Sequence, residues 1–172
     1  MDDAFWSVME AEIPWMHRQL RRLGAAPMDV EDLAQEVCIR VYERWSTRDA
    51  ARPVRPWLYA FLFRVASDHR RRARRRHPHV VVDDTTGPHA LVDPARDGES
   101  ELDAERARAL LLRALDVLSD EQRHVFLLVD LEEHAVTEAA EILGVPLNTA
   151  YTRLRRARLA LRDEVVRLRG GA

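Results

Sequence analysis

Apolar residues recur every three or four positions through most of the chain, which is the spacing of one face of an α-helix. The first stripe is formed by Phe5, Met9, Ile13, Met16 and Leu20. It predicts one helical stretch that bends or restarts at Pro14 and ends at Gly24. Because no segment alternates convincingly between apolar and polar residues, strands are not expected. The pattern therefore predicts an all-α protein.

Two more helical stripes precede position 77. They are formed by Leu33, Val37, Val41 and Trp45, and by Trp57, Phe61 and Val65. The earlier of these helices can be capped by Asp29, and the later one opens at Pro56, where proline is tolerated. Residues 46–54 form the loop between them. Since Trp57 lies in the apolar stripe, we expect it in the core.

The middle of the chain has no apolar period. Between positions 83 and 105 there are eight carboxylates against Arg96, a net charge of −7, and three prolines interrupt residues 77–103. Such a composition is typical of a flexible linker. We therefore predict two small helical domains, 1–76 and 104–172, joined by an acidic linker over 77–103.

The second domain carries the pattern of a helix-turn-helix. Ser119 and Gln122 have capping-box spacing, and helices are expected at 136–143 and 147–168. Gly144 and Pro146 separate these two helices, because glycine ends a helix and proline blocks its continuation. The second helix exposes polar side chains that can bind phosphates or base edges. They are Asn148, Thr149, Tyr151, Thr152, Arg155 and Arg156.

The distribution of charge along the chain says more about function than the overall composition does. The net charge is −2, which does not suggest a DNA-binding protein. However, residues 57–76 hold seven arginines against Asp68, a charge of +6, and residues 147–172 hold seven against two acids, a charge of +5. Two basic segments indicate nucleic-acid binding. The alternative is a helical hairpin with a solvated charged face.

Other chemistry is weakly indicated. Cys38 is the sole cysteine, so no disulfide or thiolate metal site is expected, and His77 with His79 fits a solvated linker better than a metal site. The sequence offers no nucleophile–base pair or phosphate-binding glycine loop, so we expect no enzyme activity and no cofactor. Without a signal-peptide layout or a run long enough to cross a bilayer, we expect a cytoplasmic monomer with no membrane insertion.

Several motifs resemble a known family. Residues 114–123 (ALDVLSDEQR), 138–146 (EAAEILGVP) and 153–158 (RLRRAR) resemble region 4 of bacterial sigma factors. Residues 29–37 (DVEDLAQEV) and 55–59 (RPWLY) resemble region 2. Both motifs, in this order and joined by a variable linker, are similar to sigma-70 proteins of the extracytoplasmic-function (ECF) type.

The resemblance implies a function for each domain. An ECF sigma factor binds core RNA polymerase, directs it to promoter DNA, and is often held by an anti-sigma factor. Polymerase contacts would come from Asp32, Gln35 and Glu36. The −35 element would be read by the exposed residues of the second helix given above. The −10 element would be bound by Arg48, Asp49, Arg52, Tyr59, Arg64 and Arg71, with loop 47–54 holding a flipped base.

The chain departs from the family pattern at several positions. Glu133 stands where glycine is usual, and Ala135 where a capping serine is usual, with Thr137 as a later cap. Substitutions at Phe63, Arg64 and Tyr151 mean that promoter preference is not transferable from relatives. Two other functions remain open: a helix-turn-helix regulator that acts without polymerase, and a helical adaptor that does not bind DNA.

The linker suggests a form of regulation. Its acids over 83–105 would shield the arginines at 70–76 and 153–158 while the protein is free, since a short tether gives millimolar effective concentrations. The alternative is that these charges simply keep the linker soluble and extended.

Overall fold

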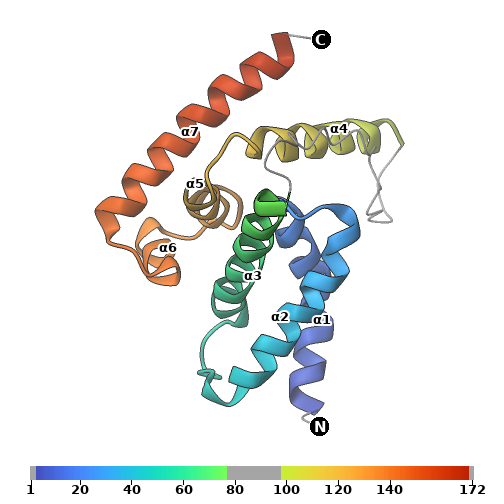
Figure 1. Ribbon diagram of the computed structural model, residues 1–172, viewed down its shortest axis with the longest axis vertical. Helices are drawn as coiled ribbons and strands as arrows, with labels where there is room; N and C mark the ends of the chain where they lie inside the picture. Colours follow the sequence, from blue (N-terminus) through green and yellow to red (C-terminus); the bar gives the residue numbers. More distant parts are fainter. Residues whose placement is uncertain (1–2, 77–97, 171–172) are drawn as a thin grey trace.

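The computed structural model describes residues 3–76 and 98–170, and regular structure in these ranges is entirely helical (Figure 1). The helices are α1 (Asp3–Arg22), α2 (Val30–Arg44), α3 (Val54–Arg76), α4 (Gly98–Leu115), α5 (Asp120–Phe126), α6 (Val136–Leu143) and α7 (Leu147–Gly170). A π-helical turn, Leu127–Leu131, continues α5. The fold is therefore all-α, as predicted, with three helices in the first domain and four in the second.

The structure describes only part of the predicted linker. Most of it, including His77, His79 and the acids before position 98, lies outside the described residues. Residues 98–103, which we assigned to the linker, belong to α4. The second domain thus begins earlier than the apolar pattern indicated, because the first turns of α4 are too acidic to show a helical stripe.

The buried face of α1 follows the predicted stripe except at one position. Phe5, Met9, Met16 and Leu20 are buried, whereas Ile13 is 37% exposed. Trp15, one residue beyond Pro14, is 4% exposed and occupies the core instead. The apolar spacing was therefore misleading at Ile13, because Trp15 and Met16 together fill the core at this turn of the helix.

Both predicted glycine stops are confirmed. Gly24 has φ 90° and Gly144 has φ 64°, a left-handed conformation that favours glycine. At each one, two backbone N–H groups bond the last carbonyls of the helix, including Ala25 to Leu20 and Val145 to Ala140, both at 3.0 Å. This is the Schellman arrangement, which ends α1 and α6 without leaving those carbonyls unpaired.

The predicted helix starts have different outcomes. The Ser119 box is confirmed, because its Oγ accepts from the Gln122 N–H at 3.3 Å and Gln122 Oε1 accepts from the Ser119 N–H at 3.1 Å. Asp29 does precede α2, but its side chain does not cap the helix. Its carboxylate lies 3.2 Å from His69 Nε2 on α3 instead.

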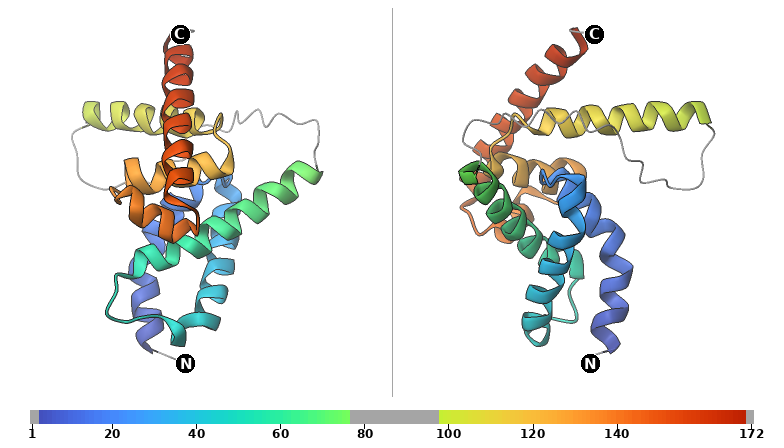
Figure 2. Two further views of the ribbon diagram at one scale, coloured as in Figure 1. Left: turned by 90° about the vertical axis from the view of Figure 1, so that its left-hand side faces the viewer. Right: turned by 45° about the vertical axis from the view of Figure 1, so that its right-hand side comes forward.

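The two domains pack against each other. Helix α6 contacts α3, and α4 contacts α1. In Figure 1, α6 lies beside α3. One continuous core joins Leu58 and Leu62 of α3 to Leu127, Leu128 and Ala139 of the second domain. The far end of α7 extends beyond the other helices (Figure 2). The described parts of the chain thus adopt a closed arrangement.

Candidate nucleic-acid interface

Helices α6 and α7 form the predicted helix-turn-helix. Ala140 on α6 packs with Ala150 and Leu154 on α7 and with Val125 on α5 in one buried cluster. Small side chains at the crossing allow the two helices to approach closely. At the start of α6, Glu138 Oε2 accepts from the Ala135 N–H at 3.2 Å. This contact partly replaces the missing serine cap, and Thr137 lies inside the first turn rather than before it.

The outward face of α7 carries the residues that we predicted for the −35 element. Asn148, Tyr151, Thr152, Arg155 and Arg156 are exposed, and Thr149 is half-buried. The Thr152 hydroxyl donates to the Asn148 carbonyl at 2.9 Å, so it is already partly used within the helix. In the described part of the chain no side chain pairs with Arg155 or Arg156. These two guanidinium groups are therefore available to an external anion.

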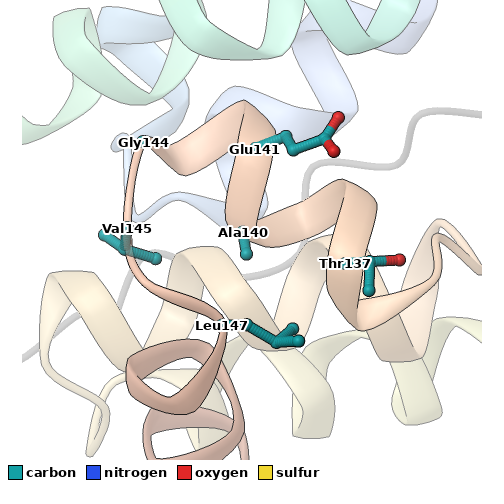
Figure 3. Close-up of a pocket in the computed structure, with 6 residues that line it drawn as sticks. All are labelled: Thr137, Ala140, Glu141, Gly144, Val145 and Leu147. Atoms are coloured by element: carbon teal, nitrogen blue, oxygen red, sulfur yellow. The ribbon is translucent and has the colours of Figure 1, made fainter.

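A shallow groove lies beside the turn of the motif (Figure 3). Its volume is about 340 Å³, and it is lined by Thr137, Ala140, Glu141, Gly144, Val145 and Leu147. The lining is mainly apolar, and its one ionisable group is a carboxylate, which would repel phosphate. The groove therefore does not extend the DNA-binding face of α7.

The predicted polymerase patch lies on α2. Asp32 and Gln35 are exposed, while Glu36 is half-buried and accepts a hydrogen bond of 2.5 Å from Arg40. Arg40 also lies 3.9 Å from Asp68 of α3. The structure thus leaves Asp32 and Gln35 open to a partner, whereas the charge of Glu36 is balanced within the domain.

The loop between α2 and α3 presents Asp49 and Arg52 to solvent, whereas Arg48 is half-buried. The Arg48 guanidinium carbon lies 4.6 Å from the centroid of the Trp45 ring, a cation–π contact. Asp49 accepts from the Ala51 N–H at 3.0 Å and lies 3.4 Å from Arg52. These local contacts order the loop, and the side chains of Asp49 and Arg52 remain 60% and 82% exposed.

The two aromatic residues at the start of α3 face inward. Trp57 packs edge-on against Trp45 and Phe61, so its placement in the core is confirmed. Tyr59, which we predicted at the −10 surface, is 1% exposed and cannot reach DNA from this position. Its hydroxyl finds no partner among the described residues, and burial strongly raises its pKa. Periodicity did not show this, because Tyr59 lies beside the stripe rather than in it.

The two remaining residues predicted for the −10 element are exposed, on the side of α3 that faces the second domain. Arg64 and Arg71 of α3 line a cleft of about 380 Å³ whose opposite wall is the start of α5. Asp120, Glu121 and His124 form that wall. Two predicted DNA-binding arginines therefore lie opposite two carboxylates of the same molecule.

The sequence did not indicate the polar contacts that join the domains. Glu132, just after the π-helical turn, accepts hydrogen bonds from Trp15 Nε1 at 2.9 Å, Gln19 Nε2 at 2.6 Å and Arg22 Nη1 at 2.8 Å. These donors lie at i, i+4 and i+7 on α1, and therefore on one helix face. Their separation from Glu132 exceeds 100 residues, so no local pattern could have revealed the cluster.

A buried arginine adds a second contact between the domains. Arg123 of α5 is 1% exposed; it donates to the Leu115 carbonyl at 2.6 Å and to Asp116 at 2.9 Å. It also donates to the Arg22 carbonyl at the end of α1, at 3.4 Å. A Cβ at Gly24 would lie 2.5 Å from Arg123 Nη1. The glycine thus serves both the helix stop and the approach of the second domain.

No helix in the described ranges is long and apolar enough to cross a membrane.

Known proteins share both halves of this architecture. The sigma-70 region 2 family model matches residues 8–76, and the sigma-70 region 4 model matches residues 108–161. The RNA polymerase sigma-E factor of Streptomyces coelicolor is 33% identical over 149 residues, which cover 87% of this chain and 78% of that protein. The ECF RNA polymerase sigma factor SigW of Bacillus subtilis is 27% identical over 171 residues, covering 95% and 89%.

Solved structures show the same fold. The sigma factor RpoE in complex with the anti-sigma factor NepR from Bartonella quintana superposes with a TM-score of 0.69 at 21% identity, covering 94% of this chain and 96% of that one. CnrH in complex with the cytosolic domain of CnrY gives a TM-score of 0.64 at 20% identity, covering 95% and 88%. With both family models in order and relatives above 30% identity, the chain belongs to the sigma-70 family, as an ECF RNA polymerase sigma factor.

Proposed function

We propose that this sigma factor divides promoter recognition between its two domains. Arg155 and Arg156 on the second helix of the helix-turn-helix carry the proposal for the −35 element, because both are exposed and no side chain of the described residues pairs with them. An arginine can bind a guanine edge with two hydrogen bonds in the major groove. Asn148, Thr149 and Tyr151, one to two turns earlier on α7, would adjust which bases are preferred, and Thr152 would contribute a phosphate or base contact.

The first domain would bind the −10 element. The loop residues Asp49 and Arg52 are exposed and Arg48 is half-buried against Trp45, and together they would hold an unstacked base. Extrusion of such a base costs a few kcal/mol, which polar contacts in the loop would offset. Arg64 and Arg71 on α3 would bind the backbone of the same strand.

Polymerase would bind on α2. Asp32, Gln35 and Glu36 form a surface that repels DNA phosphate, so a protein partner fits it better than DNA. The protein would act in the cytoplasm, where it meets core RNA polymerase. Because the RpoE structure contains a sigma factor bound to the anti-sigma factor NepR, we further propose that an anti-sigma factor holds this one.

Run-off transcription tests the proposal. Core RNA polymerase is given a library of genomic fragments, with and without the full-length protein. Specific transcripts that appear only with the protein are expected. If the protein instead binds specific duplex sites without polymerase and adds no transcripts, it is an independent regulator. If it neither binds DNA nor changes transcription, it is an adaptor.

A further inference from the structure

We infer that Trp45 and Arg48 form a stacking platform for an unstacked base in the loop between α2 and α3. The Trp45 ring supports the Arg48 guanidinium from one side, and the base stacks on the side turned away from the ring. Trp45 is a positioning residue in this arrangement, because it acts through Arg48 and does not itself touch DNA. The inference rests on the proposed function in one respect, since that function assigns the loop to the −10 strand.

The local backbone places Arg48 over Trp45. A 3₁₀ turn, Trp45–Thr47, directly follows α2, and the Arg48 N–H donates to the Trp45 carbonyl at 3.2 Å. In a 3₁₀ turn, the side chains at i and i+3 are eclipsed. The Thr47 hydroxyl donates to the Arg44 carbonyl at 2.7 Å, which holds the same turn. The Arg48 guanidinium carbon therefore lies over the Trp45 ring, 4.6 Å from its centroid.

The Trp45 ring is itself held by the core of the first domain. Edge-on contacts come from Phe5 of α1, with ring centroids 5.2 Å apart, and from Trp57 of α3, at 6.2 Å. Phe5 is 1% exposed, and Trp57 in turn packs against Phe61 at 4.8 Å. Because neighbouring helices fix the ring, Arg48 loses little conformational freedom when a base binds. The platform is thus formed before DNA arrives.

The Arg48 guanidinium remains available to a ligand. No carboxylate or other acceptor within the described ranges binds it, and the side chain is half-buried rather than buried. The loop lies at the end of the first domain opposite α4 (Figure 1). Its neighbouring side chains Asp49 and Arg52 are 60% and 82% exposed. A DNA strand can therefore approach the platform from solvent.

A second arginine–tryptophan pair among the described residues provides a contrast. The Arg55 guanidinium carbon lies 5.5 Å from the centroid of the Trp15 ring, but Arg55 Nε donates to Glu12 at 2.8 Å. Its charge is thus balanced within the protein. The Arg48 charge has no such counterion in the part of the chain that the structure describes. Arg48 can therefore attract a strand phosphate and stack with a base, whereas Arg55 is already committed.

The chemistry of the platform suits a nucleobase. Bases that leave the helix stack on arginine planes as well as on aromatic rings, and this stacking depends little on which base is present. The platform therefore accepts any base, and selection among bases falls to hydrogen bonds at the base edge, where Asp49 and Arg52 lie next in the loop. Lysine cannot replace Arg48, because an ammonium group is a point charge without a plane.

The test compares a strand that has bases with one that has none. Binding of the full-length protein to a fluorescein-labelled thymidine 20-mer and to an abasic 20-mer with the same phosphate backbone is followed by anisotropy at low salt. Phosphate contacts contribute to both affinities, so the ratio of the two affinities measures stacking. We expect the wild type to bind the thymidine strand at least about fivefold more tightly than the abasic strand.

Two variants remove the platform in different ways. Trp45→Leu removes the support and Arg48→Lys removes the plane, so each should bring the ratio close to one. Since both variants keep the positive charge, their affinity for the abasic strand should stay within about twofold of wild type. Trp45→Phe retains an aromatic ring and should recover most of the ratio. Arg55→Lys, the matched control, should keep the wild-type ratio, and circular dichroism checks the helix content of each variant.

The outcomes separate the platform from the proposed function. A wild type that binds both strands equally, or an Arg48→Lys protein with the wild-type ratio, overturns the platform. If Trp45→Leu loses helix content, Arg48→Lys decides the question alone. Where the platform is overturned but Arg52→Ala weakens binding of the thymidine strand, the loop still binds DNA, without a stack. If Arg48→Lys and Arg52→Ala both leave the two affinities unchanged, the −10 assignment of the loop fails together with the platform.

Discussion

Arg158 of α7 donates two hydrogen bonds to the carboxylate of Asp130, from Nε to Oδ2 at 3.0 Å and from Nη2 to Oδ1 at 2.7 Å. Asp130 lies in the π-helical turn after α5, so this pair fastens the DNA-binding helix to the rest of its domain. The same helix carries Arg155 and Arg156, which no described side chain engages. Arg158 therefore has a structural role, whereas Arg155 and Arg156 remain available to a ligand.

Arg155→Ala should weaken DNA binding, whereas Arg158→Ala should lower folding stability. Loss of a bidentate base contact at Arg155 should weaken −35 duplex binding by about 1–3 kcal/mol and relax preference at one base pair. Loss of the exposed pair with Asp130 should cost about 0.5–1 kcal/mol of folding stability and leave base preference intact. Binding to a panel of −35 variants and urea unfolding distinguish the two. Arg162→Ala, farther along α7, is the control. Full promoter activity in both Arg155→Ala and Arg156→Ala would contradict the assignment.

Reversal of charge at Asp32 should weaken polymerase binding. Asp32→Arg puts a positive charge in an exposed acidic patch, and we expect affinity for core RNA polymerase to fall at least about tenfold through lost complementarity. Glu10→Arg, an exposed acid on α1, should bind normally. Affinity is measured by competition for labelled core enzyme, with circular dichroism as the test of folding. Unchanged affinity in a folded Asp32→Arg protein would remove α2 from the interface.

Stability should fall below neutral pH because of His124. Burial lowers its pKa to about 3; Asp120 opposes this effect, and Arg123, Arg70 and Arg153 add to it. The packed state thus favours the neutral ring, so its contribution is complete above pH 6.5, the ordinary pKa, and is lost as pH falls toward 3.

Between pH 7.5 and 5.5 this loss should be about 1.4 kcal/mol in the free energy of unfolding. His124→Gln, which cannot be protonated, should lack that part of the pH dependence. Urea unfolding of both proteins at the two pH values gives the comparison. Equal pH dependence in wild type and variant would contradict this prediction, because it would show that protonation of His124 does not change the free energy of unfolding.

Glu133→Gly should stabilise the protein. Glu133 has φ 58°, the left-handed conformation that glycine adopts without strain, and the family commonly has glycine there. Relief of the strain should exceed the entropy gained by the unfolded chain, for a net gain of about 0.5–1 kcal/mol. Thermal unfolding should show a midpoint higher by about 1–4 °C. Glu133→Ala keeps the strain and should show no gain; an equal gain there would point to relief of charge repulsion instead.

The sequence by itself determined most of the helices and several of their ends. The Ser119–Gln122 box and the stops at Gly24 and Gly144 depend on residues within one turn, so local spacing was sufficient to predict them. The separation of the helix-turn-helix into 136–143 and the following helix was correct for the same reason. The exposed face of α7 also followed from the sequence, because period and polarity together show which side of a helix meets water.

Only the tertiary structure decided what those faces meet. Tyr59 precedes an arginine-rich stretch and was predicted to meet DNA, yet it is buried, because periodicity does not show what packs over a helix. Glu132 and Arg123 are charged residues that bind across the domain boundary to helix α1. The free energy of these hydrogen bonds depends on partners about a hundred residues away in the chain. It also depends on the shielding from water that arises only when the two domains close.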